Sequence, residues 1–313
     1  MDSTAGEIIE ILGVDIGGTK TGLIAGDSCG TICSRIEFAT EPSRGYSHWL
    51  QSLSVNYATL RASLPDWHPA AAGISVGGPA DWDSGVLLGP PNLPDWTNIP
   101  LRDDVAGAVG LSARWEHDGR AGALAEYRFG AGRGCRNMVF LTFGTGIGAG
   151  IILDGRVVRG ANGSAGEIGH VRLRRDSGPE AYGKQGSVEA YASGVGIARL
   201  ASHLYPQRWG VNVSAKDIIE ADEKSIPEAR EVLIRSAEEL GHTMAILVDL
   251  LNPECIVLGS LSRRVPGYYL ETAKKVLEKE ALPANAQACR VLPNALEDRL
   301  QDVASLVAAL DGL

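Results

Sequence analysis

Apolar and polar positions follow two patterns along this chain and divide it into strands and helices. Short apolar runs bounded by glycine predict strands, whereas apolar residues that recur every three or four positions predict helices. In the first part of the chain, the predicted strands are 8–14, 20–25, 31–40, 70–76 and 112–116, and the predicted helices are 46–64, 102–109 and 119–127. This order predicts an α/β domain.

The opening pattern returns further along the chain. Strands are predicted at 137–143, 147–153 and 156–159, and a glycine-rich turn again separates the first two. A constant offset of 127 residues relates Gly17 to Gly144, Ile24 to Ile151 and Asp27 to Asp154. This repeat predicts a duplicated βββαβα domain with one glycine hairpin in each copy.

The rest of the chain is predicted to be mostly helical. The expected helices are 191–205, 215–221, 226–251, 268–280 and, at the end, 295–310. A buried strand at 255–258 ends at Gly259-Ser260.

Composition and charge exclude several classes of protein. The 313 residues include 29 basic and 38 acidic ones, and this net charge of −9 argues against a nucleic-acid or membrane surface. The five cysteines are too scattered for a disulfide framework. The N-terminus has no apolar signal segment, and no apolar run is long enough to span a membrane. We therefore expect a cytoplasmic protein with no nucleic-acid or membrane partner.

The two glycine hairpins are candidates for binding a polyanion. Backbone amides in tight glycine turns form concave sites for anions. The glycines also suit turn geometry alone, but two hairpins in matching register favour phosphate binding.

Several motifs, in a fixed order, resemble the ROK family of the actin-like ATPase superfamily. They lie at residues 14–20 (VDIGGTK), 77–79 (GGP), 91–96, 118–126, 141–148 (LTFGTGIG), 166–170 (GEIGH) and 186–189. The resemblance implies an α/β class with a duplicated ribonuclease-H-like fold, in which two domains surround a central cleft. We expect a small N-terminal domain at 1–118, completed by the C-terminal helix at 295–313, and a larger α/β domain at 119–294.

The same resemblance implies an ATP-dependent sugar kinase that phosphorylates the 6-hydroxyl of a hexose or amino sugar. Such a transfer needs a group that accepts the hydroxyl proton. Asp118 occupies the catalytic position of the family and is the predicted general base. An Asp at a helix start is also an ordinary N-cap, and the two roles are compatible only if the carboxylate still reaches the substrate.

The nucleotide contacts implied by the family fall in three places, and ATP and Mg²⁺ are the expected cofactors. The first hairpin would position phosphates through Asp15, Gly17, Gly18, Thr19 and Lys20, with Asp15 on the hydration shell of Mg²⁺. The second hairpin would contribute Thr142, Gly144, Thr145 and Gly146. Gly259 and Ser260 resemble the turn against which the adenosine packs. No residue is assigned as a direct metal ligand.

The implied sugar-binding residues are polar and spread along the sequence. They are Gly78, Asn92, His117, Glu167, His170 and Glu189. His117 departs from the asparagine that usually precedes the catalytic Asp, so we expect an acceptor other than glucose, such as an amino sugar or a cyclitol.

A second departure removes the zinc site that many family members carry after the GEIGH motif. Glu180, Tyr182 and Ser187 stand at its three cysteine positions. Because a structural zinc site needs about four Cys or His ligands, we predict no structural zinc. Another contact, such as a hydrogen bond from Tyr182, would then have to hold the loop and His170.

The residues also allow functions beside the sugar kinase. The family includes repressors, but only 14 residues precede Asp15, which is too few for a helix-turn-helix domain. A sugar-binding sensor without catalysis, a cyclitol kinase and polyphosphate as the donor are compatible with the same motifs. The resemblance also suggests a homodimer.

Overall fold

The computed structural model describes residues 7–175 and 177–310. The chain divides into two compact units, which we call the first unit (residues 1–129, 159–163 and 296–313) and the second unit (130–158 and 164–295). Helix α3 (Asp118–Phe129) thus belongs to the first unit, whereas the domain limit predicted from the sequence lies at residue 118.

The first unit is built on a five-stranded sheet in the order β3-β2-β1-β4-β8. Its strands are β1 (Glu10–Ile16), β2 (Lys20–Asp27), β3 (Ile32–Ala39), β4 (Ala71–Val76) and β8 (Ser112–His117). The inner strand β4 is buried at all six positions, whereas β3 alternates between more and less buried residues, as expected for an edge strand with one solvated face. The first three strands are antiparallel, and β1, β4 and β8 are parallel.

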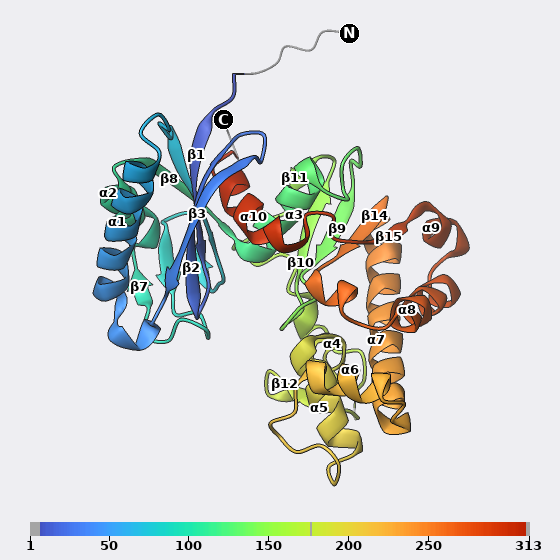
Figure 1. Ribbon diagram of the computed structural model, residues 1–313. Helices are drawn as coiled ribbons and strands as arrows, with labels where there is room; N and C mark the ends of the chain where they lie inside the picture. The colour runs from blue at the N-terminus through green and yellow to red at the C-terminus, as the bar shows by residue number, and fades with distance from the viewer. Residues whose placement is uncertain (1–6, 176, 311–313) are drawn as a thin grey trace. The chain divides into compact units, whose positions relative to one another are not determined.

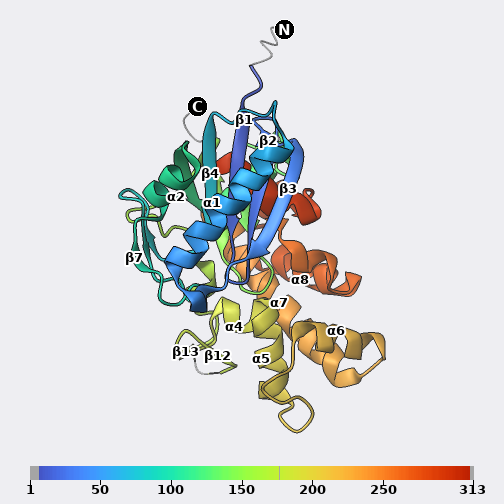
Figure 2. The ribbon, with the colours of Figure 1, turned by 60° about the vertical axis from the view of Figure 1, so that its left-hand side comes forward.

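Helices cover both faces of this sheet. α1 (Tyr46–Ser63) and α2 (Leu101–Val109) pack together, and Figure 2 shows α1 lying across the sheet. α3 and α10 (Leu300–Ala308) lie together on the other face (Figure 1). A small sheet adds β5 (Ala80–Asp81), β6 (Val86–Leu88) and β7 (Thr97–Ile99), and two short 3₁₀ helices lie at Pro42–Arg44 (η1) and Glu297–Arg299 (η4).

The second unit repeats the first in topology, with the strand order β11-β10-β9-β14-β15. These strands are β9 (Met138–Leu141), β10 (Ala149–Leu153), β11 (Arg156–Val157), β14 (Cys255–Leu258) and β15 (Arg290–Pro293). The offset of 127 relates Ile24 to Ile151, but their strand partners Gly13 and Val139 are 126 apart. The second hairpin is therefore one residue longer, and the duplicated α/β fold predicted from the sequence is confirmed.

Most helices of the second unit pack around the long helix α7 (Pro227–Leu251). The others are α4 (Val188–Ala192), α5 (Gly194–Leu204), α6 (Ala215–Glu223), α8 (Gly267–Glu280) and α9 (Pro283–Ala288), with 3₁₀ turns η2 (Ile168–His170) and η3 (Ser260–Arg263) and the hairpin β12 (Glu180–Ala181) and β13 (Lys184–Gln185). α7 and α8 run side by side (Figure 1). No helix in the described part of the chain is long and apolar enough to cross a membrane.

Candidate active site

The first glycine turn, Gly17-Gly18-Thr19, joins β1 to β2 and leaves two adjacent amides unused. The Gly17 amide donates to the Lys20 carbonyl at 3.0 Å, and the Thr40 hydroxyl donates to the Gly17 carbonyl at 2.7 Å. The amides of Gly18 and Thr19 donate to none of the described residues. Two neighbouring free N–H groups are what a phosphate oxygen requires.

Lys20, also predicted to position phosphate, lies beside this turn. Its ammonium group is 2.6 Å from a Glu37 carboxylate oxygen on β3, and its side chain is largely exposed. In this structure Lys20 therefore binds Glu37.

Asp15 lies near the end of β1, and its carboxyl group is poorly solvated. Burial, followed by the charges of Asp118 and Asp302, raises its pKa from the ordinary range to about 7, although Arg35 opposes the shift. A nearby divalent cation would favour the ionised form of Asp15. The described residues hold no cluster of three or more His, Cys, Asp or Glu side chains able to bind a metal. Mg²⁺ that arrives with phosphate oxygens keeps several waters and needs few carboxylates, and Asp15 is a carboxylate that suits such waters.

Asp118 is the first residue of α3 and presents its two carboxylate oxygens differently. Oδ1 accepts the Gly119 amide at 2.6 Å, a local bond at the helix start. Oδ2 faces Gly77, where an added Cβ would be 3.7 Å from it. The Asp118 side chain is 49% exposed, so one oxygen is held and the other is accessible.

His117 precedes Asp118, and its Nδ1 faces the same helix start. The Gly119 amide lies 3.2 Å from His117 Nδ1, and Asp118 Oδ1 lies 3.4 Å from it. The ring meets Trp82 edge to face, with centroids 5.8 Å apart, and Gly78 lies against both rings.

Asn92 is brought to the same place as Asp118. An added Cβ on Gly77 would be 3.9 Å from Asn92 Oδ1, and one on Gly18 would be 2.5 Å from the Asn92 carbonyl oxygen. Asn92 therefore packs directly on the first glycine turn and faces Gly77 beside Asp118. A residue predicted to bind sugar thus lies next to residues predicted to bind phosphate within the first unit.

A buried ion cluster supports this junction of β8 and α3. One Glu116 oxygen accepts the His117 amide at 2.9 Å and Arg120 Nε at 2.6 Å, and the other accepts Arg159 at 2.7 Å. Arg120 also donates to the Gly163 carbonyl and lies over the Trp82 ring. Because Glu116 and Arg120 are almost fully buried, they fix the backbone that carries His117 and Asp118.

The second glycine turn, residues 143–147, repeats the free amides of the first. The Gly144 amide donates to the Gly146 carbonyl at 3.1 Å, and the Thr142 hydroxyl accepts the Gly148 amide at 2.7 Å. The amides of Thr145 and Gly146 donate to none of the described residues. These two residues lie 127 positions after Gly18 and Thr19, so both hairpins offer the same pair of N–H groups.

Gly259 and Ser260 lie beside this second turn, as their predicted role requires. A Cβ at Gly259 would come within 3.0 Å of the Phe143 backbone, so only glycine fits there. A Cβ at Gly144 would be 3.7 Å from the Ser260 hydroxyl oxygen.

Glu167, His170 and Glu189 are grouped in the second unit around Tyr182. The His170 and Tyr182 rings are stacked, with centroids 3.6 Å apart. Glu189 Oε2 accepts the Ile147 amide at 3.2 Å. Tyr182 thus contacts His170 through its ring, a contact that was not predicted from the sequence.

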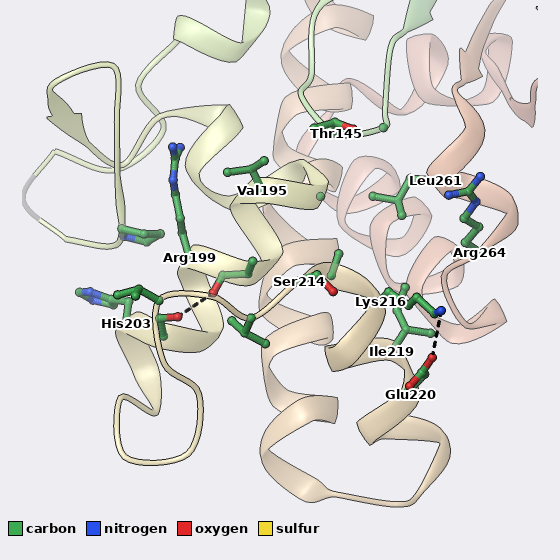
Figure 3. Close-up of a pocket in the computed structure, with 18 of the residues that line it drawn as sticks. Thr145, Val195, Arg199, His203, Ser214, Lys216, Ile219, Glu220, Leu261 and Arg264 are labelled. Atoms are coloured by element: carbon green, nitrogen blue, oxygen red, sulfur yellow. Dashed lines mark hydrogen bonds and ion pairs between the residues drawn. The ribbon is translucent and has the colours of Figure 1, made fainter. Parts of the chain in front are cut away.

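A large cavity of about 1370 Å³ opens beside the second turn, between α5 and α6 (Figure 3). Gly144, Thr145 and Ser260 line one end of it. Apolar side chains (Val195, Ile219, Leu261), basic ones (Arg199, Lys216, Arg264) and acidic ones (Glu180, Glu220, Glu223) also line it, and Lys216 pairs with Glu220 at 3.6 Å. Apolar walls suit a base and ribose, and basic groups suit phosphates.

The residues of α5 and α6 that line this cavity were not predicted from the sequence as site residues. The sequence feature that could have indicated them is Ser193-Gly194-Val195-Gly196 at the start of α5. The amides of Gly194 and Val195 donate to the Gly144 and Thr145 carbonyls at 2.8 and 3.0 Å. The N-terminus of α5 is thereby attached to the second turn.

The three positions that correspond to zinc-binding cysteines in other proteins do not fit a zinc ion here. Glu180 and Tyr182 lie in the β12–β13 hairpin, and the Ser187 hydroxyl accepts the Ala190 amide and caps α4. No thiolate is available there, and zinc sites are made of Cys and His.

Comparison with known proteins places the chain among sugar kinases. The ROK family model matches residues 11–309. A glucokinase of Halalkalibacterium halodurans is 33% identical over 290 residues, covering 87% of this chain and 86% of that protein. The ROK hexokinase of Thermus thermophilus has a TM-score of 0.85 at 27% identity, covering 96% and 98% of the two chains. A ROK glucokinase of Streptomyces griseus, solved with glucose and AMPPNP, has a TM-score of 0.77 at 30% identity, covering 97% and 100%.

Proposed function

Because the chain belongs to the ROK family and is an ATP-dependent sugar kinase, we propose that it phosphorylates the 6-hydroxyl of a hexose or amino sugar with Asp118 as the general base. The observation that most supports this role is the asymmetry of the Asp118 carboxylate. Oδ1 is held by the Gly119 amide, whereas Oδ2 is accessible beside Asn92. One oxygen is thus fixed at the helix start, and the other remains free for the base role.

In the proposed reaction, the acceptor hydroxyl gives its proton to Asp118 as its oxygen bonds to the γ-phosphorus. The bond from that phosphorus to the β–γ bridging oxygen breaks, and ADP leaves with the electron pair. The paired free amides of each turn would hold phosphate oxygens. Mg²⁺ bound with ATP would neutralise the developing negative charge, and Asp15 would contact its hydration shell.

The acceptor site would use both hydrogen-bond donors and hydrogen-bond acceptors. Asn92 and the His117 ring offer hydrogen-bond donors, and Glu167 and Glu189 offer carboxylate acceptors. A ring nitrogen at position 117 has a different reach from the asparagine amide. We therefore propose that an amino sugar is preferred over glucose, with a cyclitol as the alternative acceptor.

The test of this function is ADP release with ATP and Mg²⁺ across neutral hexoses, amino sugars, N-acetyl sugars and cyclitols. We expect one class to stimulate release strongly. Glucose as the best acceptor by a wide margin would refute the preference drawn from His117. A flat response from folded protein that binds ATP would refute the kinase and favour a sugar-binding sensor.

The base role is tested by Asp118→Asn. General-base removal should lower kcat by about 10²- to 10⁴-fold with little change in the KM for ATP. Asp66→Asn, at an exposed position, is the matched control and should retain full turnover. Nearly full turnover in folded Asp118→Asn protein would exclude Asp118 as the base.

The phosphoryl donor, the oligomeric state and the cellular location of the protein are further points of the proposal. We propose ATP rather than polyphosphate as the donor, since the apolar walls of the cavity near Thr145 suit a nucleoside. Comparing the two donors at equal phosphoryl concentration tests this. A homodimer and a cytoplasmic location remain predictions, and light scattering of the purified chain tests the first.

A further inference from the structure

The turn of the β12–β13 hairpin places a tyrosine in a conformation that tyrosine rarely adopts. Tyr182 and Gly183 are its two central residues, with φ of 57° and 68°. A two-residue hairpin of this kind needs positive φ at both positions, which Asn, Asp and Gly tolerate best. A bulky side chain with positive φ is uncommon and persists when its surroundings hold it. The contacts of the ring and the hydroxyl show what holds Tyr182.

The ring of Tyr182 lies flat on the imidazole of His170. The centroids are 3.6 Å apart and the planes differ by 16°. Such a stack fixes the plane of the imidazole through its face and leaves both ring nitrogens at its edge. The nitrogens therefore remain able to hydrogen-bond a ligand.

The other two predicted sugar contacts, Glu167 and Glu189, act on the hydroxyl of Tyr182. Burial raises the pKa of this phenol, and Glu189 followed by the charge of Glu167 raises it further. The hydroxyl thus stays protonated. Glu189 is fixed separately, because its Oε2 accepts the Ile147 amide at 3.2 Å.

Tyr182 therefore lies among three groups that were predicted from the sequence to bind sugar. Its ring stacks on His170, and the charges of Glu189 and Glu167 act on its hydroxyl. This residue also occupies one of the cysteine positions at which the chain does not fit zinc. A zinc ion would take a nitrogen of any histidine that it bound, whereas the stack takes none.

We propose that Tyr182 is a positioning residue that replaces a metal at this place, holding the His170 ring for the acceptor. This rests on the proposed function, since it requires that His170 contacts the sugar. Tyr182 has no role in the chemical step, so its loss affects acceptor binding more than turnover.

The experiment compares Tyr182→Phe and Tyr182→Leu with the control Gln185→Ala on the same hairpin. The first readout is the side-chain NMR resonances of His170, assigned with His170→Gln. A stacked ring shifts these resonances upfield. We expect the shift to persist in Tyr182→Phe and Gln185→Ala and to disappear in Tyr182→Leu.

The second readout is steady-state kinetics with the best acceptor. An aromatic contact of this kind corresponds to a change of about 3- to 10-fold in acceptor KM. Tyr182→Leu should show this increase with kcat and the KM for ATP within about twofold of wild type. Tyr182→Phe should recover most of the loss, and Gln185→Ala should show none.

The outcomes separate this proposal from the proposed function. If Tyr182→Leu leaves the His170 resonances in place, the stack does not exist in solution and the proposal is wrong, whatever the enzyme does. If the resonances move while acceptor KM stays constant in an active kinase, positioning is refuted and the kinase stands. If wild-type protein phosphorylates no acceptor, the function fails and the positioning role fails with it, although the NMR result still reports the stack.

Discussion

The two glycine turns share one backbone feature, but different residues surround them. Each leaves two adjacent amides unused, at Gly18 and Thr19 and, 127 residues later, at Thr145 and Gly146. The first turn packs against the Asn92 backbone. The second packs against the Glu189 carboxylate and the start of α5. The two copies thus share the pair of unused amides, whereas the residues that surround each turn differ.

Only the first turn has a carboxylate on the strand that leads into it. Asp15 lies in β1, whereas Leu141 and Thr142 lie at the end of β9. The first copy therefore carries the charge that suits Mg²⁺, and the second carries the cavity that suits a nucleoside. Four predictions test this division.

The largest expected effect is on stability in Asp15→Asn. Folding raises the pKa of Asp15 to about 7, whereas an unfolded Asp titrates near pH 4. The folded state therefore binds the extra proton between these values, and the stability due to this group is lost as pH rises through about 7. With EDTA present, the variant should be more stable than wild type by ~4 kcal/mol at pH 8 and by less than ~1 kcal/mol at pH 4.

Urea denaturation at both pH values measures this difference, and Asp66→Asn should show no such dependence. A constant difference between Asp15→Asn and wild type across the range would contradict a raised pKa at Asp15.

The next effect is on activity in Gly18→Ala. The added methyl would lie 2.5 Å from the Asn92 carbonyl oxygen, a backbone atom that cannot rotate away. Displacement of Asn92 and of the turn together should lower kcat/KM by about 100-fold. Gly107→Ala, in the open interior of α2, is the matched control and should remain fully active with slightly higher stability.

A smaller effect is expected in Gly146→Ala. Its methyl would lie 3.0 Å from Glu189 Oε2, the end of a side chain that can shift. We expect a loss of about 10-fold in kcat/KM, chiefly as a higher KM for ATP. A loss larger than that of Gly18→Ala would show that the second turn is the less tolerant copy.

The smallest effect should come from Thr40→Val, which removes a support of the first turn. The Thr40 hydroxyl donates to the Gly17 carbonyl and lies 2.9 Å from the Thr21 hydroxyl. Leaving these groups unpaired should cost about 1 kcal/mol of unfolding free energy. Thr59→Val, on the exposed face of α1, should change it by less than about 0.5 kcal/mol. Equal losses in the two variants would exclude a special role for Thr40.

The sequence predicted this duplication well because local signals carry it. Gly17 and Gly144 mark the turns, and apolar runs mark the strands on either side. The one-residue slip between Gly13 and Val139 was not visible, because register is set by pairing across strands. Strand β15 was missed because its four residues form a strand only against β14.

Helix limits were less accurate where a side chain caps the backbone. The helix predicted at 191–205 is two helices, because Ser193 caps α5 through the Gly196 amide. The last helix was predicted to begin at residue 295, but it begins at Leu300 after a 3₁₀ turn.

The candidate site could be predicted residue by residue but not contact by contact. Asp118, Asn92 and Gly18 were chosen separately, and their convergence near Gly77 depends on the packing of loops far apart in sequence. Tyr182 was singled out for the cysteine it replaces. The stack on His170 had no signal in sequence spacing, because it joins a hairpin turn to a 3₁₀ turn.

Helix α10 determines when each half of the chain can finish folding during synthesis. Gly13 and Gly73 approach Ser305 and Ala309 so closely that a methyl on either would clash, and α10 packs on β1, β4 and α3. The first unit therefore waits for residues at the far end of the chain, whereas all residues of the second unit precede residue 296. During vectorial synthesis the second unit can close its core first, and the sheet made earliest stays open until α10 leaves the ribosome.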